Sequence, residues 1–175
     1  QLNPDMPAEG MDRQTYLETK FGGKENAARV YGQIAEAAQA TGLNINFEGI
    51  KRTPNTIDAH RLIHWAGLEG RQTAAVSRLF KAYFEDGLDI GDRNVLLDIA
   101  EGVGLDRAMT ERLIDSDADL EDIRSRDAHA REHGVTGVPT FVLGNTHVVP
   151  GAQPPELWTK VLDEIAEQNA DGAPS

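Results

Sequence analysis

The sequence predicts an α/β protein in which helices far outnumber strands. Apolar residues recur at three- and four-residue intervals through most of residues 12–133, the spacing of helices buried on one face. Only Thr140–Val149, two apolar runs around Gly144-Asn145, is typical of a β-hairpin. A last helical stretch follows the hairpin. The predicted order is therefore a long helical region, one hairpin and one closing helix.

Capping residues and glycines divide the helical pattern into separate helices. We expect them at Asp12–Phe21, Asn26–Ala40, from Pro54-Asn55-Thr56 to about Gly67, and at Arg71–Glu85, Val95–Val103, Asp106–Ile114, Leu120–His133 and Glu156–Gln168. Asp92 is the expected cap of the helix at Val95, and Asn55 or Thr56 that of the third helix. Leu43–Phe47 alternates weakly and is a candidate short extended segment.

Two of these helices have clear apolar faces. We expect the inward residues of Arg71–Glu85 to be Ala75, Val76, Leu79, Phe80, Tyr83 and Phe84. For the last helix we expect Leu157, Val161, Leu162 and Ile165 to face inward. These faces predict a helical core, with a further layer of apolar side chains near the C-terminus.

The composition restricts the classes of partner. The net charge of −12 over 175 residues repels phosphate backbones, so we expect no nucleic-acid partner. No apolar run reaches the roughly 18 residues of a membrane span, so we expect no membrane partner and a cytoplasmic protein. The sequence has no cysteine, which excludes a disulfide, a thiolate nucleophile or a sulfur-ligated metal within these residues.

One hairpin does not make a stable sheet, because three or more strands or a covering layer are needed. Gln1–Gly10, with Pro4 and Pro7, is typical of the end of an extended segment followed by a loop. We therefore expect an N-terminal piece outside these residues to supply the other strands.

The segment Gly134-Val-Thr-Gly-Val-Pro-Thr-Phe141 precedes the hairpin. Pro139 stands where a strand begins, a position at which proline costs no ladder hydrogen bond. Gly134 and Gly137 permit a tight backbone before it. A trans proline that simply opens a strand is the alternative to the cis proline that we expect.

This segment is one of several that resemble the DsbA superfamily, and most closely its FrnE-like branch of predicted disulfide oxidoreductases. The matching segments run in family order: Leu2–Pro7 with Gly10, Pro54–Thr56, Ala59–Arg61, Trp65-Ala66, Leu79–Phe84, Asp89-Ile90, Val103–Asp106, Gly134–Phe141 and Val149–Gln153. They cover nearly the whole chain.

The resemblance implies a thioredoxin-like core interrupted by an all-helical insertion. Residues 1–10 and 116–168 would belong to the core, residues 11–115 to the insertion, and residues 169–175 to a disordered tail. In this family a β-strand and a Cys-x-x-Cys helix precede the residues seen here. The chain has neither, so we expect no catalytic residue within it.

The resemblance also assigns a substrate groove. Thr136, Gly137, Val138 and Pro139 would shape it for a protein or thiol substrate, with Gly151, Ala152 and Gln153 near the same face. His60 or Arg61 would face a cleft between insertion and core, although a structural cap or salt bridge is an equal alternative. No cofactor is implied for an oxidoreductase of this kind.

Two other functions stay open. A glutathione-dependent isomerase resembling 2-hydroxychromene-2-carboxylate isomerase shares the fold and the Gly-Val-Pro-Thr-Phe strand, with a serine in place of the first cysteine. A non-catalytic thioredoxin-fold binding module would keep the groove without thiols. Whatever the function, a homodimer is a possible cover for an exposed partial core.

Metal sites are not expected. His129 and His133 fit the spacing of an inverted zinc-peptidase motif, but a charged, solvated helix explains them better. His60 and His64, also four residues apart, make a poor site by themselves. The acidic run Asp115–Asp122 lacks the spacing of a calcium loop.

Overall fold

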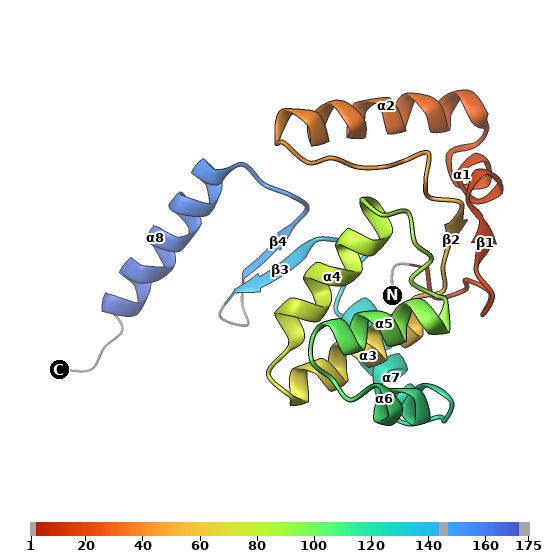
Figure 1. Cartoon of the computed structure of the whole chain (residues 1–175). Helices are drawn as coiled ribbons and strands as arrows, with labels where there is room; N and C mark the ends of the chain where they lie inside the picture. Colours follow the sequence, from red (N-terminus) through yellow and green to blue (C-terminus); the bar gives the residue numbers. More distant parts are fainter. Residues whose placement is uncertain (1–2, 144–146, 172–175) are drawn as a thin grey trace. The chain divides into compact units, whose positions relative to one another are not determined.

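The computed structural model describes residues 3–143 and 147–171 (Figure 1). The chain divides into two compact units, unit 1 at residues 3–129 and unit 2 at residues 130–175. Among the described residues, helices dominate and the strands are short, as the sequence predicts. The predicted boundary at residues 115–116 comes from the family resemblance alone and stays a prediction.

Unit 1 is mainly helical. Its elements are β1 (Met11–Asp12), α1 (Arg13–Phe21), α2 (Lys24–Ala40), β2 (Arg52–Thr53), α3 (Ile57–Leu68), α4 (Gln72–Phe84), α5 (Arg93–Gly102), α6 (Arg107–Ile114) and most of α7 (Leu120–Glu132). Unit 2 contains β3 (Thr140–Leu143), β4 (His147–Pro150) and α8 (Pro155–Asp171). Each unit is described by itself.

Aspartates begin three of the helices by accepting backbone N–H bonds that the first turn leaves unpaired. Asp92 Oδ1 accepts from Asn94 and Val95 at 2.8 and 3.1 Å, which confirms the predicted cap. Asp12 and Asp106 cap α1 and α6 in the same way. At α3, Thr56 holds the cap position without a side-chain bond, and Asn55 Oδ1 accepts from the N–H of Ile57 at 3.0 Å.

The ladder between β1 and β2 was not expected from the sequence. Met11 pairs with Thr53 and Asp12 with Arg52, antiparallel. Two-residue strands are too short to show alternation, and the candidate Leu43–Phe47 forms no strand. Gly10 precedes β1 at φ +70°, where an added Cβ would lie 2.7 Å from the carbonyl oxygen of Thr53. Glycine is therefore required for the two strands to approach here.

The core of unit 1 lies between α3, α4 and α5. Its buried cluster consists of Ala59, Leu62, Trp65, Leu79, Ala82, Leu96, Ile99 and Ala100. On each helix these side chains lie mostly three or four residues apart, in agreement with the helical periodicity of the sequence. The core thus joins segments that are separated by up to 41 residues, from Ala59 to Ala100.

On α4, the prediction that Phe80 faces the core is wrong. Phe80 is 59% exposed on α4 and stacks on Phe84, with ring centroids 6.1 Å apart. The buried face of α4 runs through Ala75, Leu79, Ala82 and Tyr83. Phe80 lies one residue, and hence about 100°, beyond Leu79 on the helix, so it points away from that face.

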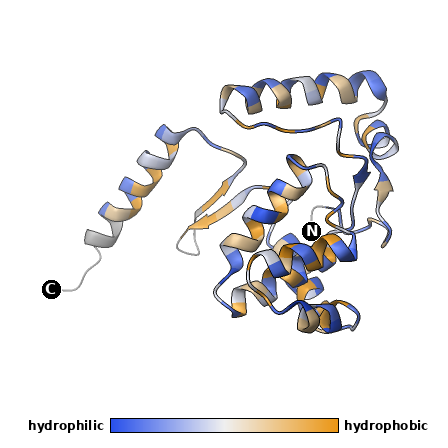
Figure 2. Cartoon of the chain, viewed as in Figure 1, coloured by the Kyte–Doolittle hydropathy of each residue, from blue (hydrophilic) through white to orange (hydrophobic). Residues whose placement is uncertain are grey.

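Unit 2 pairs β3 with β4 antiparallel, from Thr140 opposite Pro150 to Leu143 opposite His147. The predicted turn at Gly144-Asn145 and the side chain of His147 lie outside the described residues. Phe141 contacts Trp158 of α8 edge-to-face at 4.6 Å between ring centroids. Both strands are coloured as mainly hydrophobic in Figure 2.

Several apolar side chains of unit 2 are exposed: Val138, Phe141, Val142, Val148, Leu157 and Leu162. The prediction that Leu157 and Leu162 face inward is wrong, since they are 37% and 54% exposed. Residues 3–10, before unit 1's first strand, form turns closed by bonds such as Gly10 N–H to Pro7 O at 2.8 Å. Of the helices described, none combines the length and apolar character needed to cross a bilayer.

A matched pair of leucines on α3 tests where the core lies. Leu62 is fully buried, and Leu68, on the same helix, is 74% exposed. Leu62→Ala is expected to lower the free energy of unfolding by about 2–5 kcal/mol because it leaves a cavity. Leu68→Ala is expected to change it by less than about 0.5 kcal/mol. Urea denaturation followed by circular dichroism measures both, and equal effects would contradict this placement of the core.

Candidate functional site

The segment before the hairpin begins where α7 ends. The N–H of Val135 donates to Ala130 O at 3.1 Å, and that of Gly134 to Arg131 O at 2.9 Å. This pair of bonds, with Gly134 at φ +82°, is the Schellman motif that closes a helix in a left-handed residue. This motif ends α7 immediately before the segment that contains Pro139.

The loop itself is held by local hydrogen bonds. The Val138–Pro139 peptide bond is cis. Thr140 Oγ1 donates to Gly137 O at 2.8 Å, and Gly151 N–H donates to Pro139 O at 2.7 Å. The second bond extends the β3–β4 ladder by one step. It brings the two predicted groove segments, Thr136–Pro139 and Gly151–Gln153, together at one end of the hairpin.

The other groove residues follow from this arrangement. Gln153 Nε2 donates to Pro150 O at 2.7 Å, which folds its side chain back on the end of β4. Ala152 and Thr136 are exposed, and Gly151 adopts φ +78°. After the hairpin, therefore, Gly151 has no side chain, Ala152 has a small one, and that of Gln153 is held against Pro150.

Val138 is the most exposed apolar residue of the segment, at 69%. Within residues 3–143 and 147–171, no hydrogen bond engages its backbone N–H or C=O. Such groups are available to a peptide that lies along the loop. Among the same residues, no three His, Asp or Glu side chains gather as metal ligands.

His60 and Arg61 lie on α3 in unit 1. Arg61 is 2% exposed, and its guanidinium donates to the carbonyls around the end of α6: Leu113 at 2.6 Å, Ile114 at 3.3 Å, Ser116 at 2.7 Å and Ala118 at 2.8 Å. Asp58 accepts a further bond at 2.8 Å. Leu113 and Ile114 lie in the last turn of α6, where a helix leaves carbonyls without partners in the ladder and where the helix dipole favours a cation, and Ser116 and Ala118 follow that turn. Its contacts give Arg61 a structural role, and the predicted cleft role stays a prediction.

Trp65 and Asp119 complete the arrangement. The Arg61 guanidinium lies 4.9 Å from the centre of the Trp65 ring, a cation–π distance. Trp65 Nε1 donates to Asp119 Oδ2 at 2.8 Å. Asp119 adopts a left-handed φ of 57°, and its carbonyl accepts from Ile123 in the first turn of α7. One turn of α3 therefore positions both the end of α6 and the start of α7.

His60 is half-buried, one residue earlier on α3. Its Nδ1 lies 2.6 Å from Thr56 O, a distance that requires a proton on Nδ1. Burial lowers the pKa of His60 because it disfavours the charged imidazolium. The ring is thus a neutral donor within its own helix near neutral pH.

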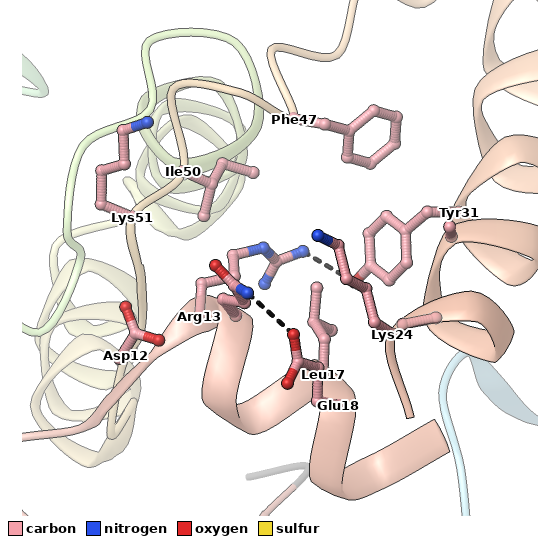
Figure 3. A pocket seen from close by; sticks show the side chains of 12 residues that line it. Asp12, Arg13, Leu17, Glu18, Lys24, Tyr31, Phe47, Ile50 and Lys51 are labelled. Atoms are coloured by element: carbon pink, nitrogen blue, oxygen red, sulfur yellow. Dashed lines mark hydrogen bonds between the residues drawn. The ribbon is translucent and has the colours of Figure 1, made fainter. Parts of the chain in front are cut away.

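Unit 1 also has an open cavity of about 410 Å³ beside α1 and α2 (Figure 3). Arg13, Tyr31 and Phe47 line it, together with residues of the segment before β2. Sequence reasoning did not single out Arg13. Its burial depends on Tyr83, 70 residues away, and no local pattern indicates that contact.

Comparison with known proteins relates the chain to one protein family and one curated protein. The family model of the DsbA-like thioredoxin domain matches residues 1–163. The uncharacterized Bacillus subtilis protein YwbO is 32% identical over 132 residues, which are 75% of this chain and 66% of YwbO. The chain therefore spans just under two thirds of the length of this curated relative.

Two solved structures are similar. The crystal structure of a probable DsbA oxidoreductase from Streptomyces coelicolor has a TM-score of 0.84 and 29% identity, covering 99% of this chain and 74% of that one. A 2-hydroxychromene-2-carboxylate isomerase has a TM-score of 0.71 and 20% identity, covering 94% and 83%. At that identity the second similarity concerns the fold alone. Together the matches confirm the resemblance to the DsbA superfamily, while the assignment to its FrnE-like branch stays a prediction.

The bonds of Arg61 predict that lysine cannot replace it. One ammonium group cannot reach the carbonyls that the planar guanidinium spans, so buried acceptors lose their donors. Arg61→Lys is expected to lower the free energy of unfolding by about 3 kcal/mol. Arg78→Lys, at an exposed ion pair with Asp86, is the control and is expected to change it by less than about 0.5 kcal/mol. Chemical denaturation checks both, and a loss no larger than that of the control would contradict the structural role.

The lowered pKa of His60 predicts a pH effect of known sign. The unfolded chain binds a proton at His60 more readily than the folded chain does. The contribution of His60 to the free energy of unfolding is therefore complete above about pH 6.5 and is lost as the pH falls below that value. We expect the free energy of unfolding, measured by urea denaturation, to fall more between about pH 7.5 and about pH 5.5 in the wild type than in His60→Gln. The excess cannot exceed about 1.4 kcal/mol per pH unit. Identical losses in the two proteins would contradict the prediction.

Proposed function

The chain belongs to the DsbA-like thioredoxin domain family, and from that premise we propose that it forms the substrate-binding part of a protein dithiol–disulfide oxidoreductase of the FrnE-like branch. The observation that carries the proposal is the loop at Val138–Pro139, tied to Gly151 by the bond to Pro139 O and left open at Val138. In this proposal an extended segment of a protein substrate pairs with the backbone of Val138. Thr136, Gly137, Ala152 and Gln153 border it.

The reactive thiols lie outside these residues in this proposal. The chain has no cysteine, and thiol–disulfide exchange begins with attack by a thiolate. We propose a Cys-x-x-Cys segment in the part of the protein that corresponds to the additional length of its relatives. Support comes from the relatives themselves, of which the matched part spans 66% of YwbO and 74% of the Streptomyces protein. Cytoplasmic location is part of the same proposal.

The exposed apolar side chains of unit 2 fit this account. Val142 and Val148 of the hairpin and Leu162 of α8 stay uncovered in the chain as it stands. We propose that strands of the same additional segment cover them, since a sheet of two strands is marginal. A homodimer is the alternative cover, and the mass of the intact protein in sedimentation distinguishes the two.

A glutathione-dependent isomerase is the second candidate. The similarity to 2-hydroxychromene-2-carboxylate isomerase supports it, although 20% identity extends only to the fold. The absence of cysteine does not separate the two candidates, because in both the reactive residue lies outside this sequence. The sequence of the intact gene product decides between the candidates. A Cys-x-x-Cys pair supports the oxidoreductase, and a serine at the first position supports the isomerase. If the sequence has neither the cysteine pair nor the serine, it supports a non-catalytic binding module.

Substitution of Val138 tests the substrate groove in the intact gene product. Val138→Asp is expected to lower kcat/KM for insulin reduction about tenfold, because it places an unpaired charge where the substrate backbone and side chains pack. Leu68→Asp adds the same charge at a similarly exposed leucine of unit 1 and is expected to leave kcat/KM unchanged. Equal rates for the two variants would remove Val138 from the substrate site. Absence of insulin reduction by the wild type would reject the oxidoreductase itself.

A further inference from the structure

The cavity of unit 1 is a second place where the chain can bind a ligand. It lies between α1, the first turns of α2 and the segment before β2, and its volume is about 410 Å³. Its apolar walls are Leu17, Ala27, Ala28, Tyr31, Phe47 and Ile50. Tyr31 and Phe47 contact edge-to-face at 5.3 Å between centroids, so one wall is aromatic and preformed. Small-molecule sites have this character and about 300–1,000 Å³ of space.

A guanidinium forms the polar end of the cavity. Arg13 is 9% exposed, and Nη1 and Nη2 donate to the hydroxyls of Tyr83 at 2.9 Å and Tyr31 at 2.7 Å. These bonds use two of the five N–H groups of an arginine side chain. Among the residues that the structure describes, Arg13 forms no ion pair with a carboxylate.

Two neutral phenols do not compensate a buried charge. The Arg13 guanidinium lies 5.2 and 5.8 Å from the centres of the Tyr31 and Tyr83 rings, which offsets part of the cost of burial. A buried cation is ordinarily paired with an anion, because desolvation disfavours the lone charge. Figure 3 shows Arg13 reaching into the space that Tyr31, Phe47 and Ile50 surround. An anion bound in the cavity would supply the missing pair.

The charges around the cavity favour a single negative charge on the ligand. Arg13, Lys24 and Lys51 line it, against Asp12 and Glu18, so its formal charge is +3 − 2 = +1. Both acids are engaged, because Asp12 accepts from Thr15 and Glu18 from Gln14. The remainder of the chain is strongly acidic, with a net charge of −12 overall. A locally positive cavity on such a protein selects for anions.

We propose that this cavity binds a small organic monocarboxylate with an apolar body. The carboxylate pairs with Arg13 and with the ammonium groups of Lys24 and Lys51 at the rim, and the body packs against Tyr31, Phe47 and Ile50. A phosphate or other dianion fits less well, since the net charge is +1 and most of the walls are apolar. All of these residues belong to unit 1, so the proposal is independent of the redox function.

A pair of isosteric probes tests the charge. Isothermal titration of the full-length protein with 4-phenylbutyrate and with its neutral amide compares ligands of equal size. The carboxylate is expected to bind saturably and at least about tenfold more tightly than the amide, because a charge-assisted bond to a partly desolvated arginine contributes at least that factor. Equal affinities, or no saturable binding of the carboxylate, overturn the proposal.

A pair of variants tests the location. Ala28→Phe fills the cavity from an exposed position of α2, and Ala37→Phe adds the same side chain at an exposed position of α2 outside it. Carboxylate affinity is expected to fall at least about tenfold in the first variant and to stay at the wild-type value in the second. Arg13→Gln is expected to abolish the preference for the carboxylate over the amide, and Lys51→Gln provides the same comparison at an exposed residue if Arg13→Gln does not fold. Equal affinities of the two phenylalanine variants overturn the assignment to this cavity.

Discussion

The burial of the Arg61 guanidinium is the constraint on which the second half of unit 1 depends. A helix leaves its last carbonyls without partners in the ladder, and those of Leu113 and Ile114 in α6 lie against the buried Arg61 side chain. Arg61 donates to four carbonyls between Leu113 and Ala118, so a side chain of α3 completes the end of a helix more than 50 residues away. The charge is compensated by Asp58 on its own helix and by the Trp65 ring. The same turn of α3 reaches Asp119, where α7 begins.

This arrangement shows why local signals predicted the helices but not the tertiary contacts between them. Asp92 caps α5, and Gly134 ends α7 through bonds within four or five residues, so both were readable from neighbouring residues. Arg61 was marked as a candidate by the family resemblance, yet its donors reach residues 52 to 57 positions away. No periodicity encodes such a separation. The prediction that Phe80 is buried was wrong for a related reason. Only the positions of α3 and α5 decide which edge of the apolar stripe of α4 is buried.

The candidate site divides in the same way between what the sequence predicts and what only the fold provides. The segment Gly134–Phe141 was identified by its resemblance to the family, and the residues that shape its backbone, such as Gly134 and Pro139, lie within the segment itself. Arg13, by contrast, is an ordinary cation next to the α1 cap until α2 and α4 place Tyr31 and Tyr83 against it. The two regions also differ in chemistry. In the functions that we propose, the loop offers open backbone groups to a peptide, whereas the cavity offers a charge within apolar walls to a small anion.

The loop does not rely on a large core to keep its shape. Its geometry rests on the two bonds that close α7 at Gly134, on the bond from Thr140 to Gly137 and on the bond from Gly151 to Pro139. Each spans at most 12 residues, and together they specify the backbone on both sides of Val138. The apolar cluster of unit 1 has the opposite character, because its helices are stabilised mainly by one another. A short, locally bonded loop is therefore able to present the same backbone groups whichever further elements cover the exposed face of unit 2.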